Sequence, residues 1–507
     1  MFENQPKGLF ALALANTGER FGYYTMLAVF ALFLRANFGL EAATAGQIYS
    51  TFLALVYFLP LIGGILADKI GYGKCVTIGI MVMFLGYILL AVPLGAGGTA
   101  MGAMIAALVL ISFGTGLFKG NLQVMVGNLY DDPKYADKRD AAFSLFYMAI
   151  NIGAMFAPTA AVKIMEWAQT SLGVSVNDSY HFAFMVACAS LVLSIAIYYA
   201  CRPWFKHVEN SAKQVATTSG AKVEELTPEQ TKKRIVALCL VFAVVIFFWM
   251  AFHQNGLTLT YFANEFVQPL CTGVQTMAFD IINLVMIVVM VYGGFSLVQS
   301  KELKTKLISG GAIVAALGVL AYKYLNISAE GITLSAPIFQ QFNPFYVVAL
   351  TPFSMALFGA LAKKGKEPSA PRKIALGMVV ATIAYIVMAV ACVGLLTPNA
   401  QAVAGEGATF VNANVLIYTY LILTFAELLL SPMGISFVSK VAPPKYKGMM
   451  MGGWFVATAI GNYLVSIGGN LWGDMPLWGV WSVFVGVCAV AAIFMYSMMK
   501  KLEDATK

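Results

Sequence analysis

The sequence predicts an all-α polytopic membrane protein. Of its 507 residues, 60% are hydrophobic and only 11% are charged, and the mean hydropathy is +0.79. That leaves too little polar surface to cover a water-soluble core of this size. The apolar runs are long, whereas a transmembrane barrel would show short alternating segments. The composition therefore argues against soluble enzymes, disordered chains and disulfide-rich proteins.

About 20 consecutive apolar residues cross a bilayer as a helix, because every backbone group must then be paired within the segment. By this criterion we expect fourteen spans. They lie near residues 9–34, 46–67, 75–94, 101–127, 140–164, 181–203, 235–263, 276–299, 306–325, 342–362, 372–396, 412–438, 449–471 and 477–499.

The positions of lysine and arginine predict the orientation. With the N-terminus inside, most of the 32 basic residues fall on the cytoplasmic side, and Arg35, Lys163 and Lys323 fall on the outer side. We therefore expect a multi-pass protein of the inner (cell) membrane with both termini in the cytoplasm. The net charge of +8 reflects lysines and arginines in loops that face the anionic inner leaflet of the lipid bilayer. No nucleic-acid partner is expected.

A long polar stretch divides the spans into six and eight. Residues Thr227 to Gln230 within it have the pattern of a helix cap, which suggests a short amphipathic helix. Two spans of the second half, 276–299 and 306–325, lack polar stripes. We expect them to form an extra hairpin outside the main bundles. The predicted organisation is an N-terminal six-helix bundle (1–203), a cytoplasmic linker (204–234) and a C-terminal bundle (235–507) that includes the hairpin at about 276–325.

The sequence shows no sign of a cofactor or of catalysis. Seven cysteines occur without a CxxC spacing and mostly inside apolar runs, so they read as packing residues, not as a metal site or a disulfide frame. No HExxH, GxSxG or phosphate-binding loop stands at a supporting position. We therefore expect no enzyme, no metal and no cofactor.

Several expected spans carry polar side chains on one helical face. An ionisable group at the centre of a span costs roughly 2.5 to 3.5 kcal/mol, so each needs a partner or a wet cavity. The stripes are Asn16, Glu19, Arg20, Tyr23 and Tyr24 in the first span, Lys119 and Gln123 in the fourth, Ser144, Tyr147 and Asn151 in the fifth, Trp249 and His253 in the seventh, and Tyr420, Thr424, Glu427 and Ser431 in span 412–438.

The four intramembrane charges suggest a dipolar cavity. Arg20 and Lys119 belong to the N-terminal half and Glu427 to the C-terminal half, so facing walls would carry opposite charges. Such a cavity suits a zwitterion with separated amine and carboxylate ends. Together with Glu19 the charges sum to zero, and a purely structural charge cluster remains the alternative. Hydrogen bonds between helices would explain the tyrosines, Ser144 and Gln123 equally well.

These residues lie in recognisable motifs. Gly63 to Lys74 matches the loop-two motif of the major facilitator superfamily, and from about Gly18 to Asn470 the chain resembles the proton-coupled oligopeptide transporter family of that superfamily. The matching motifs are GERFGYY at 18–24, GLFKGN at 116–121, FYMAINIG at 146–153, FNP at 342–344, ELLLSP at 427–432 and GGWF at 452–455. The resemblance implies the major facilitator fold, with twelve core helices in two six-helix bundles. The extra hairpin departs from the family in its position, because bacterial members usually add two helices between the sixth and seventh spans, whereas here the two surplus spans follow the seventh.

The resemblance also implies a function, a secondary active transporter that imports di- and tripeptides with protons by alternating access. It implies that Arg20 and Lys119 hold the peptide carboxylate and that Glu427 binds the amine. The other implied substrate-binding residues are Asn151 and Asn343 at the peptide backbone, Tyr23, Tyr24 and Tyr57 in the pocket lining, Trp454 at the side-chain pocket, and Ser431.

Departures from the family pattern bear on proton coupling. Asn16 and Leu27 stand where the family has an acid and an arginine, and His253 stands where it has the acid of its outer-gate pair. We expect Glu19 to be the principal proton carrier. His253 is expected to modulate the outer gate, because imidazole titrates near pH 6.5, unless it is only a hydrogen-bonded structural residue. The alternative function is a carrier of peptide-like or other small solutes with weak or no coupling; a channel or membrane enzyme is less well supported.

Overall fold

The computed structural model describes residues 5–135, 139–210, 226–443 and 446–505, which fold almost entirely into helices. Fourteen helical stretches are long and apolar enough to cross a bilayer, which confirms the predicted number of spans. The chain is therefore a multi-pass membrane protein. The central part of the predicted linker, residues 211–225, lies outside the described residues.

The first six spans pack chiefly against one another, and we call them the N-terminal group. Small residues let their backbones approach closely, as is usual for helix contacts in membranes. Gly63 faces Gly116 in this way, and a Cβ atom on either residue would overlap the neighbouring helix. The helices are α1 (Lys7–Phe38), α2 (Ala42–Ile70), α3 (Tyr72–Ala91), α4 (Gly98–Asn128), α5 (Arg139–Leu172) and α6 (Val176–Ala200), followed by the short 3₁₀ turns η2 (Arg202–Trp204) and η3 (Lys206–Val208).

The later helices, apart from an inserted hairpin, form the C-terminal group. They are α7 (Pro228–Phe252), η5 (His253–Gly256), α8 (Thr258–Glu265), η7 (Ala336–Gln341), α11 (Phe342–Lys363), α12 (Ala370–Ala391), α13 (Pro398–Val403), η8 (Gly405–Gly407), α14 (Asn414–Val441), α15 (Lys447–Tyr463), α16 (Ser466–Leu471), α17 (Leu477–Ser497) and α18 (Met499–Asp504).

Two spans that the sequence predicts as continuous, 235–263 and 449–471, are broken in the structure. The first passes through η5 before α8 begins, and the second is interrupted between α15 and α16. A side chain replaces backbone bonding at the breaks, because Gln254 Nε2 donates to the carbonyl oxygen of Val465 at 3.0 Å. Hydropathy alone cannot predict such breaks, since a broken span is as apolar as a straight one.

The start of α7 has the predicted cap. Thr227 Oγ1 accepts from the backbone N–H of Gln230 at 3.2 Å, and the Gln230 side chain accepts from the backbone N–H of Thr227 at 3.0 Å. The amphipathic helix expected after Thr227 is not a separate element, however. It forms the first turns of α7, which continues without interruption from Pro228 to Phe252.

The inserted hairpin consists of α9 (Ile281–Gln299) and α10 (Leu303–Leu325), preceded by η6 (Gly273–Phe279). The protein buries only 11% and 6% of their most apolar windows, against 67% for α1. The hairpin is attached through α9, where the Tyr292 hydroxyl donates to the carbonyl oxygen of Val348 in α11 at 3.1 Å. The strand β1 (Leu270–Cys271) pairs antiparallel with β2 (Ile332–Thr333) and joins the segments that enter and leave the hairpin.

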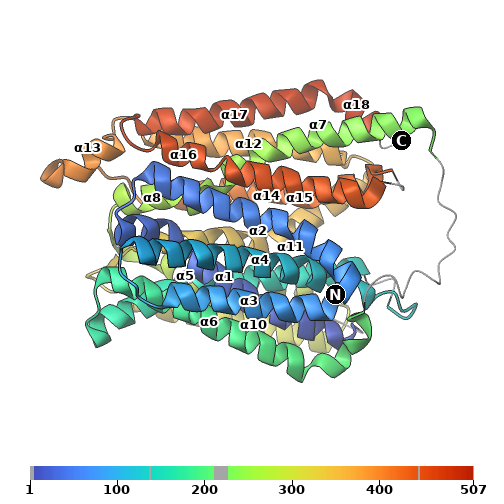
Figure 1. The fold of residues 1–507 in the computed structure, drawn as a ribbon, viewed down its shortest axis with the longest axis horizontal. Coiled ribbons are helices and arrows are strands. Elements are labelled where there is room, and N and C mark those ends of the chain that lie inside the picture. Colours follow the sequence, from blue (N-terminus) through green and yellow to red (C-terminus); the bar gives the residue numbers. More distant parts are fainter. Residues whose placement is uncertain (1–4, 136–138, 211–225, 444–445, 506–507) are drawn as a thin grey trace.

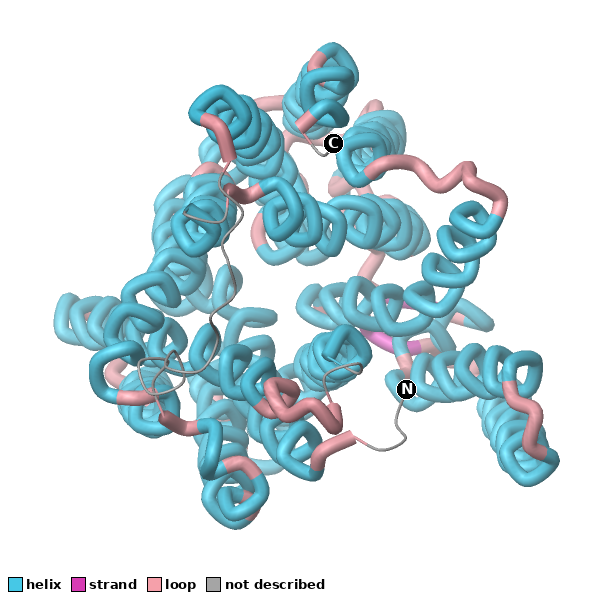
Figure 2. The backbone as a smooth tube through the Cα atoms, turned by 90° about the vertical axis from the view of Figure 1, so that its right-hand side faces the viewer, coloured by secondary structure: helices cyan, strands magenta, loops and turns pink. Residues whose placement is uncertain are grey.

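The molecule has two distinct ends. Helix α1 begins and α18 ends at the right of Figure 1, and we call this the termini side. The short helices α8, α13 and α16 lie at the opposite end, which we call the far side. Figure 2 looks from the termini side and shows most spans nearly end-on, so the spans run roughly parallel from one side to the other.

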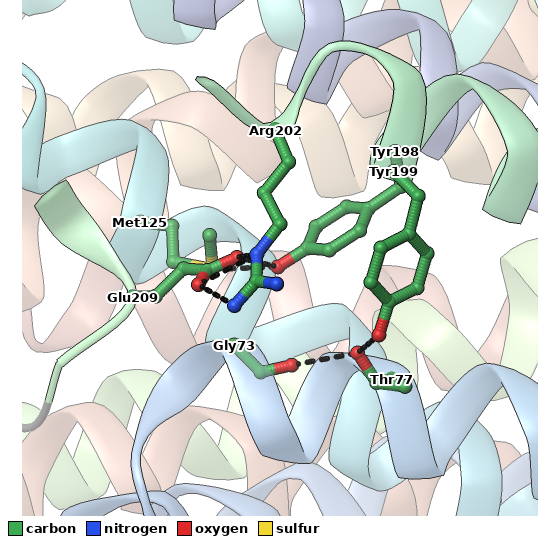
Figure 3. A network of polar contacts seen from close by, with 7 residues as sticks. All are labelled: Gly73, Thr77, Met125, Tyr198, Tyr199, Arg202 and Glu209. Carbon is green, nitrogen blue, oxygen red and sulfur yellow. Dashed lines mark hydrogen bonds and ion pairs between the residues drawn. The ribbon is translucent and has the colours of Figure 1, made fainter. Parts of the chain in front are cut away.

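On the termini side, the chain that leaves α6 is held against the turn between α2 and α3 (Figure 3). Arg202 contacts the Glu209 carboxylate through Nε and Nη2 at 2.9 and 2.7 Å, and the Tyr198 hydroxyl donates to it at 3.0 Å. The carbonyl oxygen of Glu209 accepts from the backbone N–H of Gly73 at 3.1 Å. A Cβ atom on Gly73 would lie 2.7 Å from the Glu209 side chain, so the contact requires glycine.

Candidate functional site

The first pair of intramembrane charges lies on α1. Nε and Nη2 of Arg20 are each 2.5 Å from a carboxylate oxygen of Glu19, and the two side chains are only 2% and 0% exposed. The guanidinium also lies over the Tyr23 ring, 4.5 Å from its centre. Mutual neutralisation offsets part of the cost of burying both charges. Nη1 remains as the guanidinium nitrogen that bonds to no described residue.

Lys119 supplies the second cation, from α4. Its Nζ lies 4.2 Å from the centre of the Tyr57 ring, which projects from α2. Among the described residues, no carboxylate forms an ion pair with Lys119. The sequence allowed Glu19 to face either cation, and in the structure both oxygens of Glu19 bond to Arg20. Lys119 is therefore the more available of the two cations.

The intramembrane acid predicted for the C-terminal half, Glu427, lies on α14. Glu427 is 8% exposed, and one carboxylate oxygen accepts from Asn343 Nδ2 at 2.8 Å. Asn343 is the second residue of α11 and also donates to Thr424 at 3.1 Å. The second oxygen of Glu427 is 3.5 Å from the hydroxyl of Tyr147, which comes from α5 of the other group. Glu427 thus lies where the two groups face each other.

His253 lies at the break that follows α7. Its Nδ1 is 2.5 Å from Oδ1 of Asn462 near the end of α15, and its ring stacks on Trp249 with 5.0 Å between centroids. The Tyr57 ring, which carries Lys119 on its face, is 6.0 Å away. His253 therefore makes the kind of hydrogen bond that a purely structural residue would make. Its ring also lies close to the N-terminal group.

The remaining predicted residues line these clusters or lie behind them. Asn151 donates to the carbonyl oxygen of Tyr147 at 3.0 Å, one turn away on α5. Ser431 follows Glu427 by one turn on α14 and is half-buried. Trp454 is buried, and its ring lies where a Cβ atom of Gly434 would be. The rings of Tyr23 and Tyr24 meet edge to face, 5.2 Å apart.

Three residues at the site were absent from the predicted set. Tyr147 contacts Glu427, whereas Trp249 and Asn462 hold the His253 ring. Tyr147 and Trp249 belong to the polar stripes of their spans, so the pattern already marked them as candidates. Nothing in the sequence distinguishes Asn462, because its partner lies 209 positions away.

The two groups also contact each other directly next to the site, toward the far side of the molecule. Thr159 of α5 donates to the side chain of Gln341 at 2.8 Å, and Gln340 Nε2 donates to the carbonyl oxygen of Ala28 in α1 at 3.0 Å. The site therefore has a closed side, where η7 bonds to helices of the N-terminal group. The described residues contain no cluster of three or more potential metal ligands.

Comparison with known families identifies the kind of protein. The sequence pattern of the POT family matches residues 74–224 and 316–475. The chain belongs to the POT family. It is thus a transporter and not an enzyme, and the resemblance seen in its motifs is confirmed.

Curated relatives match over nearly the whole chain. The uncharacterized transporter YclF of Bacillus subtilis (strain 168) is 29% identical, and the alignment covers all of this chain and 95% of that protein. Dipeptide and tripeptide permease A of Klebsiella pneumoniae (strain 342) is 27% identical over 90% of this chain and 82% of the relative. The permease of the same name from Salmonella typhimurium (strain LT2) is 25% identical, with 99% and 94% covered.

Solved structures confirm the fold. A crystal structure of a peptide transporter POT in complex with sulfate gives a TM-score of 0.75 at 23% identity and covers all of this chain and 96% of the other. A POT family transporter in complex with 5-aminolevulinic acid gives 0.73 at 20% identity, with 100% and 98% covered. At these identities the likeness concerns the architecture of the spans.

Proposed function

We propose that the chain imports di- and tripeptides together with protons, by alternating access across the inner membrane, with its termini side in the cytoplasm. The observation that carries the proposal is the separation of charge: Arg20 and Lys119 belong to one helix group and Glu427 to the other. A short peptide is a zwitterion whose two ends match these walls. The names of the permeases among the curated relatives support this substrate class.

The carboxylate end of the peptide is assigned to Lys119 and Arg20. Lys119 forms no ion pair with a described residue, and its ammonium needs only a compact anion to satisfy its donors. Arg20 offers Nη1, since Nε and Nη2 bond to Glu19. A carboxylate bound by both cations would be held by charge-assisted hydrogen bonds, which are stronger than neutral ones.

The amine end is assigned to Glu427. A carboxylate has about four acceptor sites, and the bonds from Asn343 and Tyr147 occupy two of them. An ammonium can therefore bind without displacing Asn343, and it can replace the long contact to Tyr147. Asn343 and Asn151 then lie on opposite walls and can bond to the peptide backbone, while Tyr24, Trp454 and Ser431 line the space for side chains.

The proton is assigned to Glu19. Protonation of this carboxylate would remove its charge and release two guanidinium nitrogens of Arg20 toward the cavity. A free Arg20 binds a peptide carboxylate more strongly, so a proton on Glu19 and a peptide in the site would each favour binding of the other. The pairing of Glu19 with Arg20 supports this assignment. His253 is kept as a modulating residue because its ring approaches Tyr57 and Lys119.

A second candidate is a carrier of the same fold that moves peptide-like or other small solutes with weak or no proton coupling. It is favoured by Asn16, Leu27 and His253, which stand where the family has titratable or charged residues. Uptake into proteoliposomes, with the pH gradient and the membrane potential set independently, separates the two. Symport predicts that dipeptide accumulates when only an inwardly directed proton gradient is imposed. Equilibration without accumulation would support the uncoupled carrier, and no uptake of any peptide would refute both.

A further inference from the structure

The inserted hairpin contacts α11 at a proline. Pro352 lies inside α11 and has no N–H to donate to the carbonyl oxygen of Val348, four residues earlier. A carbonyl group freed in this way is costly in a membrane unless another donor reaches it. The hydroxyl of Tyr292 in α9 donates to this same carbonyl oxygen at 3.1 Å. The hairpin thus supplies the hydrogen bond that the proline removes.

A second contact lies on the other side of Pro352. The ring of Phe295, one turn after Tyr292 on α9, meets the ring of Phe353 edge to face, with 5.1 Å between the centroids. A proline is the commonest cause of a sharp bend in a helix. One helix of the hairpin therefore contacts α11 directly before and directly after the residue at which α11 can bend.

The second helix of the hairpin supports the first at this level. Gly293 of α9 lets α10 approach closely, because a Cβ atom on it would lie 2.9 Å from the side chain of Ile313. The hydroxyl of Ser309 in α10 donates to the hydroxyl of Ser296 in α9 at 2.8 Å. Helix α10 is therefore packed against α9 at the turns of α9 that contact α11.

The root of the hairpin is fixed to the C-terminal group. Gln275 of η6 donates to the side chains of Asn412 and Asn414, at the start of α14, at 2.6 and 2.8 Å. The backbone N–H of Gln268 donates to the carbonyl oxygen of Val411 at 2.9 Å. Because its root is held at α14, the hairpin gives α11 a support that belongs to the same helix group.

The two halves of α11 differ in burial. All buried residues of this helix, which the structure describes from end to end, precede Pro352. The buried half begins at the substrate site, where Asn343 donates to Glu427 at 2.8 Å. Because successive spans alternate in direction, the half from Phe353 to Lys363 ends on the termini side. An alternating-access carrier must open and close that side, and bending at a few residues is one way in which packed elements move.

We propose that the hairpin sets the bend of α11 at Pro352, and that Tyr292 is a positioning residue that acts through this bend on the transport cycle. The proposal rests on the proposed function only in requiring that the termini side opens and closes. A hydrogen bond between membrane helices shifts an equilibrium by about three- to tenfold. Loss of the Tyr292 bond should change the population of the bend seen in this structure by the same factor.

Tyr292→Phe removes the hydroxyl and keeps the ring. In proteoliposomes the maximum rate of dipeptide uptake should fall about three- to tenfold. The dissociation constant of the dipeptide should stay unchanged, because the bond to Val348 lies outside the substrate site. The matched control is Tyr322→Phe on α10, whose side chain is 66% exposed, and it should alter neither quantity. Weaker binding by Tyr292→Phe at an unchanged maximum rate would overturn the proposal.

A comparison in the Pro352→Ala background shows whether Tyr292 acts through the freed carbonyl. Alanine restores the N–H that bonds to the carbonyl oxygen of Val348, so the Tyr292 hydroxyl becomes redundant. Tyr292→Phe should therefore alter the bend of α11 in the wild-type background and have no effect on it beside Pro352→Ala. The same effect in both backgrounds would show that Tyr292 acts in another way, and the proposal would be wrong.

Spin labels measure the bend without substrate or transport. The exposed residues Lys363, at the end of α11, and Lys500, in α18, are replaced by cysteine in a background that lacks the native cysteines, all of which are free thiols. The helix from Pro352 to Lys363 is about 16 Å long, so a change of about 20° in the bend moves its end by about 6 Å.

Tyr292→Phe should broaden the distribution of distances between the two labels. Pro352→Ala should narrow it and make it insensitive to Tyr292→Phe. A distribution that Tyr292→Phe leaves unchanged in the wild-type background would overturn the proposal. If the labels behave as expected while the unmodified protein takes up no peptide, the control of the bend by the hairpin stands and the proposed substrate is wrong.

Discussion

Replacing Glu427 with glutamine removes the negative charge of the C-terminal wall and alters little else. The glutamine side chain has nearly the same shape, its oxygen can accept from Asn343, and its amide can donate to the Tyr147 hydroxyl. Both contacts of Glu427 are thereby retained in the variant. We therefore expect the Glu427→Gln protein to fold and to show an unchanged thermal unfolding curve.

Binding should change according to the peptide's amine. Glu427 is 8% exposed, so a peptide ammonium placed against it is largely desolvated. Leaving one charge of such a pair unmatched costs roughly 2 to 5 kcal/mol, which corresponds to a loss of affinity of about 30-fold or more. An N-acetylated peptide has no ammonium and should lose at most one ordinary hydrogen bond, which corresponds to a loss of less than about tenfold.

The assay compares the dissociation constants of one dipeptide and its N-acetyl form, measured calorimetrically on purified wild-type and Glu427→Gln protein. Tyr147→Phe is the matched control, because it removes the 3.5 Å contact to Glu427 without changing the charge of the site, and should affect both peptides alike. Equal losses for the two peptides in Glu427→Gln would refute the reasoning. Glu427 would then be a structural partner of Asn343 rather than the amine site.

Three further predictions concern proton coupling and the packing of the termini side. Glu19→Gln should abolish pH-driven accumulation in proteoliposomes while peptide counterflow stays measurable; accumulation against a gradient by this variant would contradict the assignment. His253→Ala should shift the pH optimum of uptake without abolishing transport, since it removes the bond to Asn462 but no charge of the dipolar site. Gly73→Ala should lower the melting temperature by several degrees, because the added methyl group would lie 2.7 Å from the Glu209 side chain. Overpacking of this kind costs roughly 1 to 3 kcal/mol. An unchanged melting temperature would show that the loop moves aside freely.

The spans, the cap of α7 and the stripe of α1 could be predicted because they depend on local patterns. The fourteen apolar runs correspond to fourteen membrane-spanning stretches among the described residues, and the Thr227 to Gln230 pattern forms the capping box that it predicts. The breaks at His253 and after Tyr463 could not be predicted. They depend on side chains of one helix bonding to the backbone of another, and hydropathy does not record such contacts.

The candidate site was predictable in its residue types but not in its pairings. Buried charge marked Glu19, Arg20, Lys119 and Glu427, since each is costly in a membrane. Their partners depend on helix packing: Tyr147 reaches Glu427 across 280 positions of sequence. The sequence predicted Arg35 only as a charge on the outer side. The fold shows that it forms an ion pair with Glu265 of α8.

The central claim is that the site binds both ends of a zwitterionic peptide at once. Counterflow of a labelled dipeptide in proteoliposomes, inhibited in turn by the unlabelled dipeptide, its N-acetyl form and its C-terminal amide, tests this claim most directly. The account predicts that both modified peptides inhibit far more weakly than the parent, because each leaves Glu427 or the Arg20 and Lys119 pair unmatched. Equal inhibition by either modified peptide would contradict it.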